Sequence, residues 1–177
     1  MRRFLRNIAV VAVVVLTMTG CFKKVTTDTT LRVKTLLQEV SGGDLLPAEG
    51  TFAYIYYTDS EEWVIESYAD AVAKTITNPA TGEKRSEPDG ESEPYRIEGS
   101  DNNYLSIFQD KAPALLVVVE PVSKMYGYMY RKAEAENLTY TYLTIIFRPW
   151  KQDNYSEGSK EGYKWNVVVP EKEESNE

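Results

Sequence analysis

Alternation of apolar and polar residues is the feature that most restricts how this chain of 177 residues can fold. In residues 30–38, one side of an extended chain carries Leu31, Val33, Thr35 and Leu37. The other side carries Arg32, Lys34 and Gln38. A period of two residues is typical of a strand with one buried face, so this segment predicts a half-buried β-strand.

Further runs are rich in β-branched and aromatic residues, which favour strands. They are residues 51–57, 104–108, 114–119, the two halves of 125–147, and 162–170. The turn-rich stretch 41–50 separates the first two strands, which are expected to form a hairpin or a pair joined by an ordered loop. About seven strands predict an all-β fold, an antiparallel β-sandwich of the immunoglobulin-like or prealbumin-like kind.

One short helix is expected within this β-rich domain. Ser67 and Asp70 have the spacing of a capping box ahead of residues 68–76. The periodicity of that segment places four side chains on the inward face: Tyr68, Ala69, Val72 and Ile76. Residues 78–103 contain three prolines and few apolar residues, so they predict a long surface loop with either a binding role or simple mobility.

Tyrosine is concentrated in residues 125–147. If this segment folds back on itself about Glu134, Tyr128 lies opposite Tyr140 and Tyr126 opposite Tyr142. The four tyrosines would then share one face, and aliphatic residues would occupy the other. Filling the core is the commonest role for such residues, but this set is the best candidate for a binding face because its opposite face can already supply the core.

The spacing of the strands resembles the prealbumin-like folds, including the regulatory domains of carboxypeptidases. The resemblance lies in the first strand, the loop "GDLLPAEG" and the strand "TFAYIYY", and it extends over roughly residues 30–150. It implies a sandwich in which "TFAYIYY" faces outward. It carries no diagnostic functional residue, and a shared fold does not determine function.

The N-terminus reads as an export signal. Three arginines precede an apolar run, residues 8–16, that is too short to cross a bilayer as a helix. Gly20 and Cys21 follow it and resemble the lipobox of bacterial lipoproteins, in which the cysteine becomes the acylated N-terminus. The alternative is a secreted protein that is cut nearby and keeps a free thiol at Cys21.

The lipobox resemblance implies four regions: a signal peptide (1–20), a lipidated tether (21–29), the β-sandwich domain (30–170) and a charged disordered tail (171–177). Several acyl chains, such as palmitate, on Cys21 would anchor the domain stably to a membrane. Phe22 stands where enteric lipoproteins carry an Asp for retention in the inner membrane. The resemblance therefore implies a protein of the outer membrane that faces the periplasm.

Composition excludes several functions. Residues 1–20 contain three of the 20 basic residues and none of the 27 acidic ones, so the mature chain has a formal charge of 17 − 27 = −10. Such a chain is repelled by nucleic acid. The chain has no histidine and one cysteine, which excludes catalytic triads that use His and the usual zinc sites. We therefore expect no enzyme, cofactor or metal, although a pair of carboxylates as catalysts remains conceivable.

Two weaker candidates are loop sites for calcium, at residues 88–93 and 99–103, whose oxygen ligands lack EF-hand spacing. The leading hypothesis is a lipid-anchored envelope protein that acts as a non-catalytic binding or accessory subunit of another envelope protein. The alternative is a glycan-binding module, in which tyrosine and tryptophan side chains stack on the sugar rings of a polysaccharide.

Overall fold

The structure is a computed structural model that describes residues 27–97, 104–133, 139–160 and 163–170. The signal peptide (1–20), Cys21 and the tail (171–177) lie outside these ranges. The described residues form twelve strands and one short α-helix, so the fold is mostly β, as predicted. No helix among the described residues is long and apolar enough to cross a membrane.

The first sheet is built around β1 (Thr29–Leu37). One edge of β1 pairs in parallel with β10 (Tyr140–Phe147), so that Arg32 lies beside Tyr142. The other edge pairs antiparallel with β7 (Leu105–Gln109) and, further along, with β2 (Leu46–Pro47). Burial alternates strictly along β1, which confirms the predicted half-buried strand.

The second sheet has six strands, all paired antiparallel. In spatial order they are β11 (Tyr155–Lys160), β12 (Tyr163–Val168), β9 (Met125–Arg131), β8 (Ala114–Glu120), β3 (Phe52–Tyr57) and β6 (Gly90–Glu91). The seven predicted strands correspond to β1, β3, β7, β8, β9, β10 and β12. The remaining strands are β11 and four segments of two residues each, which are too short to show a periodic pattern.

The two sheets share one hydrophobic core. The first sheet contributes residues such as Leu31, Val33 and Ile145, and the second contributes residues such as Leu116 and Trp165. At the open edge of β10, the indole Nε1 of Trp165 donates to the carbonyl oxygen of Thr144 at 2.9 Å. The hydroxyl of Tyr155 donates to the carbonyl of Ile146 at 2.6 Å, so side chains from the second sheet occupy two edge acceptors.

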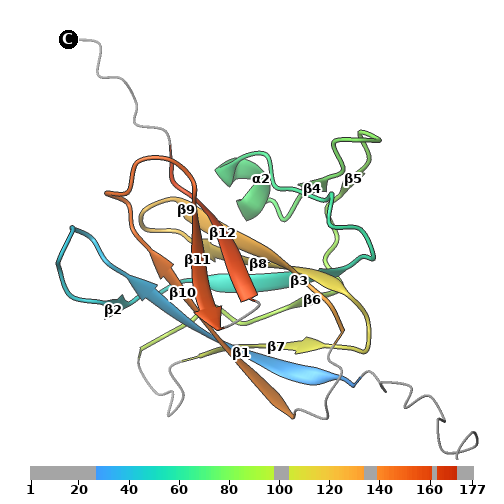
Figure 1. Ribbon diagram of the computed structural model, residues 1–177, viewed down its shortest axis with the longest axis horizontal. Coiled ribbons are helices and arrows are strands. Elements are labelled where there is room, and N and C mark those ends of the chain that lie inside the picture. The colour runs from blue at the N-terminus through green and yellow to red at the C-terminus, as the bar shows by residue number, and fades with distance from the viewer. Residues whose placement is uncertain (1–26, 98–103, 134–138, 161–162, 171–177) are drawn as a thin grey trace, which may run out of the picture.

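A second core lies on the opposite side of the second sheet. Residues 58–77, here named the cover segment, contain α2 (Tyr68–Val72) and β4 (Ile76–Thr77), which pairs with β5 (Lys84–Arg85). Trp63, Ile65, Ala71 and Ile76 from this segment pack on the sheet. Figure 1 shows α2, β4 and β5 grouped above the second sheet. Both faces of the central strands β3 and β8 are therefore buried, one beneath the first sheet and one beneath the cover segment.

The predicted tyrosine hairpin in residues 125–147 is wrong. β9 pairs with β8 and β12, whereas β10 pairs with β1 in the other sheet. Glu134, the proposed turn, lies outside the described residues. The aliphatic residues of both strands do face the core, but they meet across it from opposite sheets instead of standing side by side in one.

Two local expectations also need correction. The Ser67 cap is confirmed, since its side chain accepts a hydrogen bond from the Asp70 amide. The helix ends at Val72 and buries Ala71; of the predicted inward residues, Tyr68 and Ile76 pack against the second core, whereas Ala69 and Val72 are exposed. Residues 30–38 and 51–57 form no hairpin, because β1 and β3 belong to different sheets. "TFAYIYY" does not face outward, because β3 is an inner strand covered on both sides.

Candidate functional site

The four tyrosines proposed as a binding face divide between the two sheets. Tyr126 and Tyr128 lie on β9, on the side of the second sheet that meets the cover segment. Tyr140 and Tyr142 lie on β10, on the outer side of the first sheet. The structure therefore brings them together in pairs and does not form one face of four.

Tyr126 packs against the cover segment and binds it through a hydrogen bond. Its side chain is 2% exposed, and its hydroxyl donates to the carbonyl oxygen of Ile65 at 3.1 Å. Burial, with a smaller effect from Tyr128, raises its pKa to about 12. The phenol is therefore neutral at physiological pH and is occupied by a structural hydrogen bond.

Tyr128 is more accessible than Tyr126. Its ring stacks on that of Tyr126 with centroids 6.4 Å apart and planes inclined by 20°. Burial raises the pKa of its hydroxyl as well. Together with Tyr68 it lines a hollow between the cover segment and the end of β12.

Tyr140 and Tyr142 belong to a larger exposed surface on the first sheet. Their side chains are 44% and 52% exposed, and that of Phe108 on β7 is 54% exposed. Register places Phe108 and Tyr140 on either side of Thr30. We name this surface the aromatic face and define it by Arg32, Tyr104, Phe108, Tyr140 and Tyr142.

Arg32 is the centre of the aromatic face. Its Cζ lies 4.1 Å from the ring centroid of Tyr140 and 6.0 Å from that of Tyr142. Tyr104 packs edge-on against Tyr142 at 5.5 Å, which extends the cluster. The Nε of Arg32 is shielded from solvent and makes no hydrogen bond within the part of the chain that the structure describes. Cation–π contacts hold the guanidinium in place while its hydrogen-bonding capacity remains unused.

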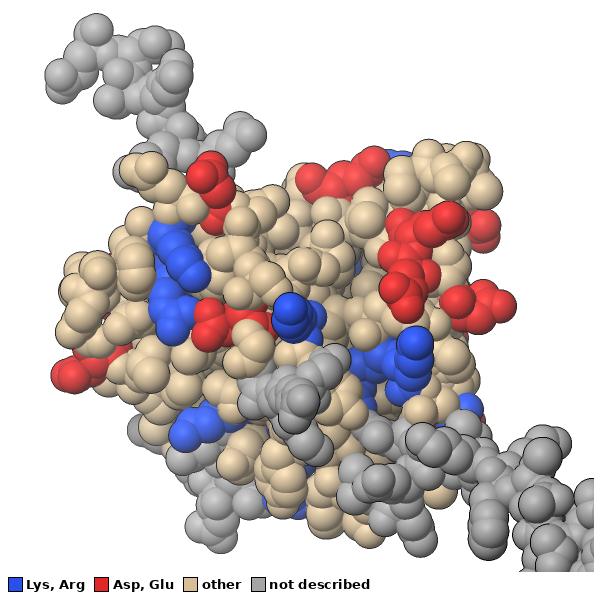
Figure 2. Space-filling model, viewed as in Figure 1, with Lys and Arg blue, Asp and Glu red and all other residues tan. Residues whose placement is uncertain are grey.

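The outer side of the first sheet has an unusual charge for this acidic protein. The outward positions on its three longer strands are Thr30, Arg32, Lys34, Leu36, Ser106, Phe108, Tyr140, Tyr142, Thr144 and Ile146. They include two cations and no carboxylate, although acidic residues outnumber basic ones by 27 to 20 in the chain. Figure 2 shows acidic side chains gathered instead over the α2, β4 and β5 region, at the upper right.

The aromatic residues of the two sheets thus differ in whether another segment covers them. On the second sheet, tyrosines of β3 and β9 are covered by residues 58–77 and donate hydrogen bonds to them. On the first sheet, the aromatic face has no corresponding cover among the described residues. An exposed patch of large aromatic side chains is characteristic of an interaction surface.

Sequence reasoning missed Arg32 and Phe108 as site residues. The available signal was the outward position of each in its predicted strand. Their meeting with Tyr140 depends on the pairing of β1 with β7 and β10, strands that lie far apart in the sequence.

Carboxylates of the predicted surface loop, residues 78–103, bind neighbouring groups of the protein itself. A carboxylate oxygen of Asp89 accepts the Tyr57 amide at 2.7 Å and also binds Arg85 at 3.1 Å. Glu91 pairs with Lys74. No group of three acidic, cysteine or histidine residues that could hold a metal ion occurs among the described residues, and the second calcium candidate, 99–103, lies outside them.

Comparison with protein-family models, with curated proteins and with solved structures finds no match to this chain. Its function must therefore be argued from its own residues.

Proposed function

We propose that this protein is a lipoprotein of the outer membrane, anchored through Cys21, and that it acts as a non-catalytic accessory subunit of another envelope protein. The observation that carries the proposal is the aromatic face, which is exposed, aromatic and free of carboxylates. In the same molecule the comparable side of the second sheet is covered by residues 58–77. The exposed side is the one available for a partner.

The chemistry of the aromatic face suggests the kind of protein surface that it binds. Aromatic residues and arginine are the side chains most enriched at binding hot spots. The positive guanidinium of Arg32 lies over Tyr140, and Lys34 adds a second positive charge on the same strand. A partner that presents a carboxylate beside apolar side chains would complement both features.

The domain that presents this face is assigned to residues 30–170. We propose that its two facing sheets represent an immunoglobulin-like or prealbumin-like sandwich, to which residues 58–77 add a third layer. Lipid anchoring at Cys21 would hold the domain at the membrane, with eight residues, 21–28, ahead of the start of β1 at Thr29. A chain of that length spans at most about 28 Å when fully extended.

Site-specific photo-crosslinking of the full-length protein in intact cells tests the proposal. A photoreactive amino acid replaces Tyr142 on the aromatic face or, as a control, Val72, which is 47% exposed on the cover segment. We expect a stoichiometric adduct with one envelope protein from position 142 and none from position 72. Arg32→Gln and Cys21→Ser should each reduce that adduct. Equal adducts from both positions, or no adduct at all, would refute the assignment of this face.

A further inference from the structure

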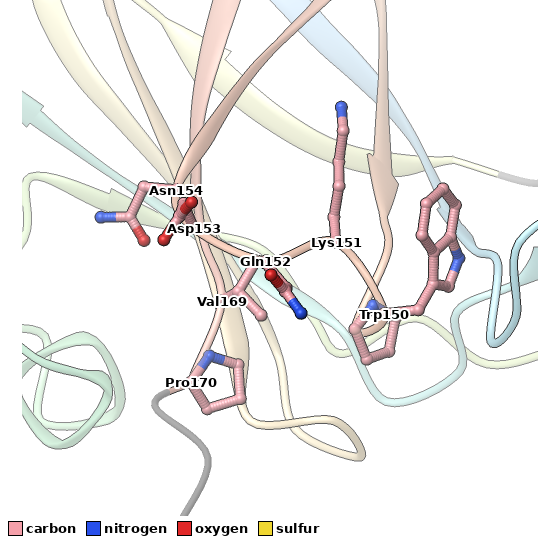
Figure 3. A pocket seen from close by; sticks show the side chains of 8 residues that line it. Trp150, Lys151, Gln152, Asp153, Asn154, Val169 and Pro170 are labelled. Carbon is pink, nitrogen blue, oxygen red and sulfur yellow. The ribbon is translucent and has the colours of Figure 1, made fainter.

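Two adjoining hollows lie on the surface where β12 ends, away from the aromatic face. One, of about 660 Å³, is lined by residues 149–154 together with Val169 and Pro170 (Figure 3). The other, of about 540 Å³, is lined by residues 65–68, by Tyr126 and Tyr128, and by the same Val169 and Pro170. Asn154 also borders both, so the hollows adjoin along three residues, and we name the two together the groove.

We infer that this groove binds a neutral oligosaccharide. Aromatic side chains are present in both halves. Trp150, which is 37% exposed, lines the first hollow, and the half-buried Tyr68 and Tyr128 line the second. The rings of these residues offer apolar surface with a polar edge, which suits the C–H faces and hydroxyl groups of a sugar ring.

Polar groups in the groove have unused hydrogen-bonding capacity. The hydroxyls of Tyr68 and Tyr128 have no hydrogen-bond partner within the described residues, and burial raises the pKa of both, which keeps them protonated as donors. The side-chain amides of Gln152 and Asn154 are also free of partners there. Each amide can donate to one hydroxyl and accept from another.

The charge of the groove favours an uncharged ligand. Lys124 and Lys151 contribute two positive charges, and Glu66 and Asp153 contribute two negative ones. Figure 3 shows Lys151, Gln152 and Asp153 on the loop that borders the first hollow. Because these charges balance, neither a polyanion nor a polycation is selected. The two hollows in succession fit a chain of linked sugars better than a single monosaccharide.

A peptide that binds by strand addition is a poorer fit. Such a peptide needs a free strand edge for its backbone hydrogen bonds. β12, which leads into the groove, is paired with β11 on one edge and with β9 on the other. Binding must therefore rely on side chains, as in recognition of sugars.

Calorimetry with the full-length lipidated protein in detergent tests this inference. The probes are four neutral hexasaccharides: cellohexaose, chitohexaose, maltohexaose and xylohexaose. We expect at least one to bind, with affinity reduced about tenfold by Trp150→Ala and severalfold by Tyr128→Phe, which removes one hydroxyl and keeps the ring. Tyr142→Ala, on the aromatic face, is the matched control and should leave the affinity unchanged.

Three results would overturn the inference: no binding of any hexasaccharide, binding that Trp150→Ala and Tyr128→Phe leave intact, or binding that Tyr142→Ala reduces equally. Tyr68→Phe provides a second mild variant, and circular dichroism of each variant identifies loss of fold. The experiment uses neither Cys21 variants nor a protein partner. Its failure is therefore separate from failure of the proposed accessory role.

Discussion

Gly127 on β9 is a sensitive point of contact between the two sheets. A Cβ added at this position would overlap the Cδ1 atom of Ile145 on β10, while its other neighbours, in Asn166 and Val167, would be 3.6 Å away. Ile145 is fully buried, so its side chain has little room to move. Gly127→Ala should therefore destabilise the protein by about 1–3 kcal/mol, the usual cost of overpacking a core.

The location of the overlap also predicts its remedy. Ile145→Val removes Cδ1 and alone should cost about 0.5–1.5 kcal/mol, because it leaves a small cavity. In the double variant the new Cβ occupies the vacated space, so the two losses should not add. We expect a favourable coupling energy of about 1 kcal/mol, within the range observed for residues in contact.

Urea denaturation of wild type, both single variants and the double variant, followed by tryptophan fluorescence, measures this coupling. Leu143→Ala combined with Gly127→Ala is a suitable control. Leu143 is buried on β10, as Ile145 is, but it is not among the nearest neighbours of the added Cβ. If the effects of Gly127→Ala and Ile145→Val are simply additive, β9 and β10 do not face each other across the core as described.

Three further predictions concern the cover segment and the edge of β10. Burial raises the pKa of Tyr126 from 10.0 to about 12, so the stability contributed by its neutral hydroxyl is present below pH 10 and is lost as the pH rises towards 12. Tyr126→Phe should therefore flatten the decline in unfolding free energy between pH 9 and 11, measured by urea denaturation. Ser67→Ala removes the cap of α2 and should cost about 1 kcal/mol, with faster amide exchange at residues 69–73 than in a Ser86→Ala control. Tyr155→Phe leaves the Ile146 carbonyl without its donor and should lower the unfolding free energy by about 1–2 kcal/mol in thermal denaturation, whereas an equal effect from Tyr142→Phe would contradict this assignment.

Local patterns predict individual strands well in this protein and predict their neighbours poorly. The alternation from Leu31 to Leu37 and the apolar run of β8 are properties of a single strand, and both are correct. The partners of a strand depend on residues far away in sequence. β9 and β10 are adjacent in the chain, which favoured a hairpin, but β9 pairs with strands of the second sheet and β10 pairs with β1 in the first.

The cover segment explains why the tyrosine face was only partly predictable. Sequence alone does not show that residues 58–77 fold over β3 and β9, since the periodicity of residues 68–76 predicts a helix with an inward face but not the strands on which it packs. The sequence therefore predicts Tyr126 to lie on the surface, although the cover segment, including Ile65, buries it. Tyr140 and Tyr142 do lie on an exposed face, but Arg32, whose guanidinium lies over Tyr140, joins them through the pairing of β10 with β1.

The parallel pairing of β1 with β10 has a consequence for the order of folding. Thr30 lies beside Tyr140, so β1, the first of the described strands, has no partner on that edge until more than a hundred residues have followed it from the ribosome. The β8–β9 ribbon, by contrast, joins nearby residues and can form early. Because closing long loops is entropically costly, the first sheet should assemble late and slowly. A chain secreted from its N-terminus would keep that edge of β1 unpaired during transit, and completion of the first sheet would wait for β10 to arrive.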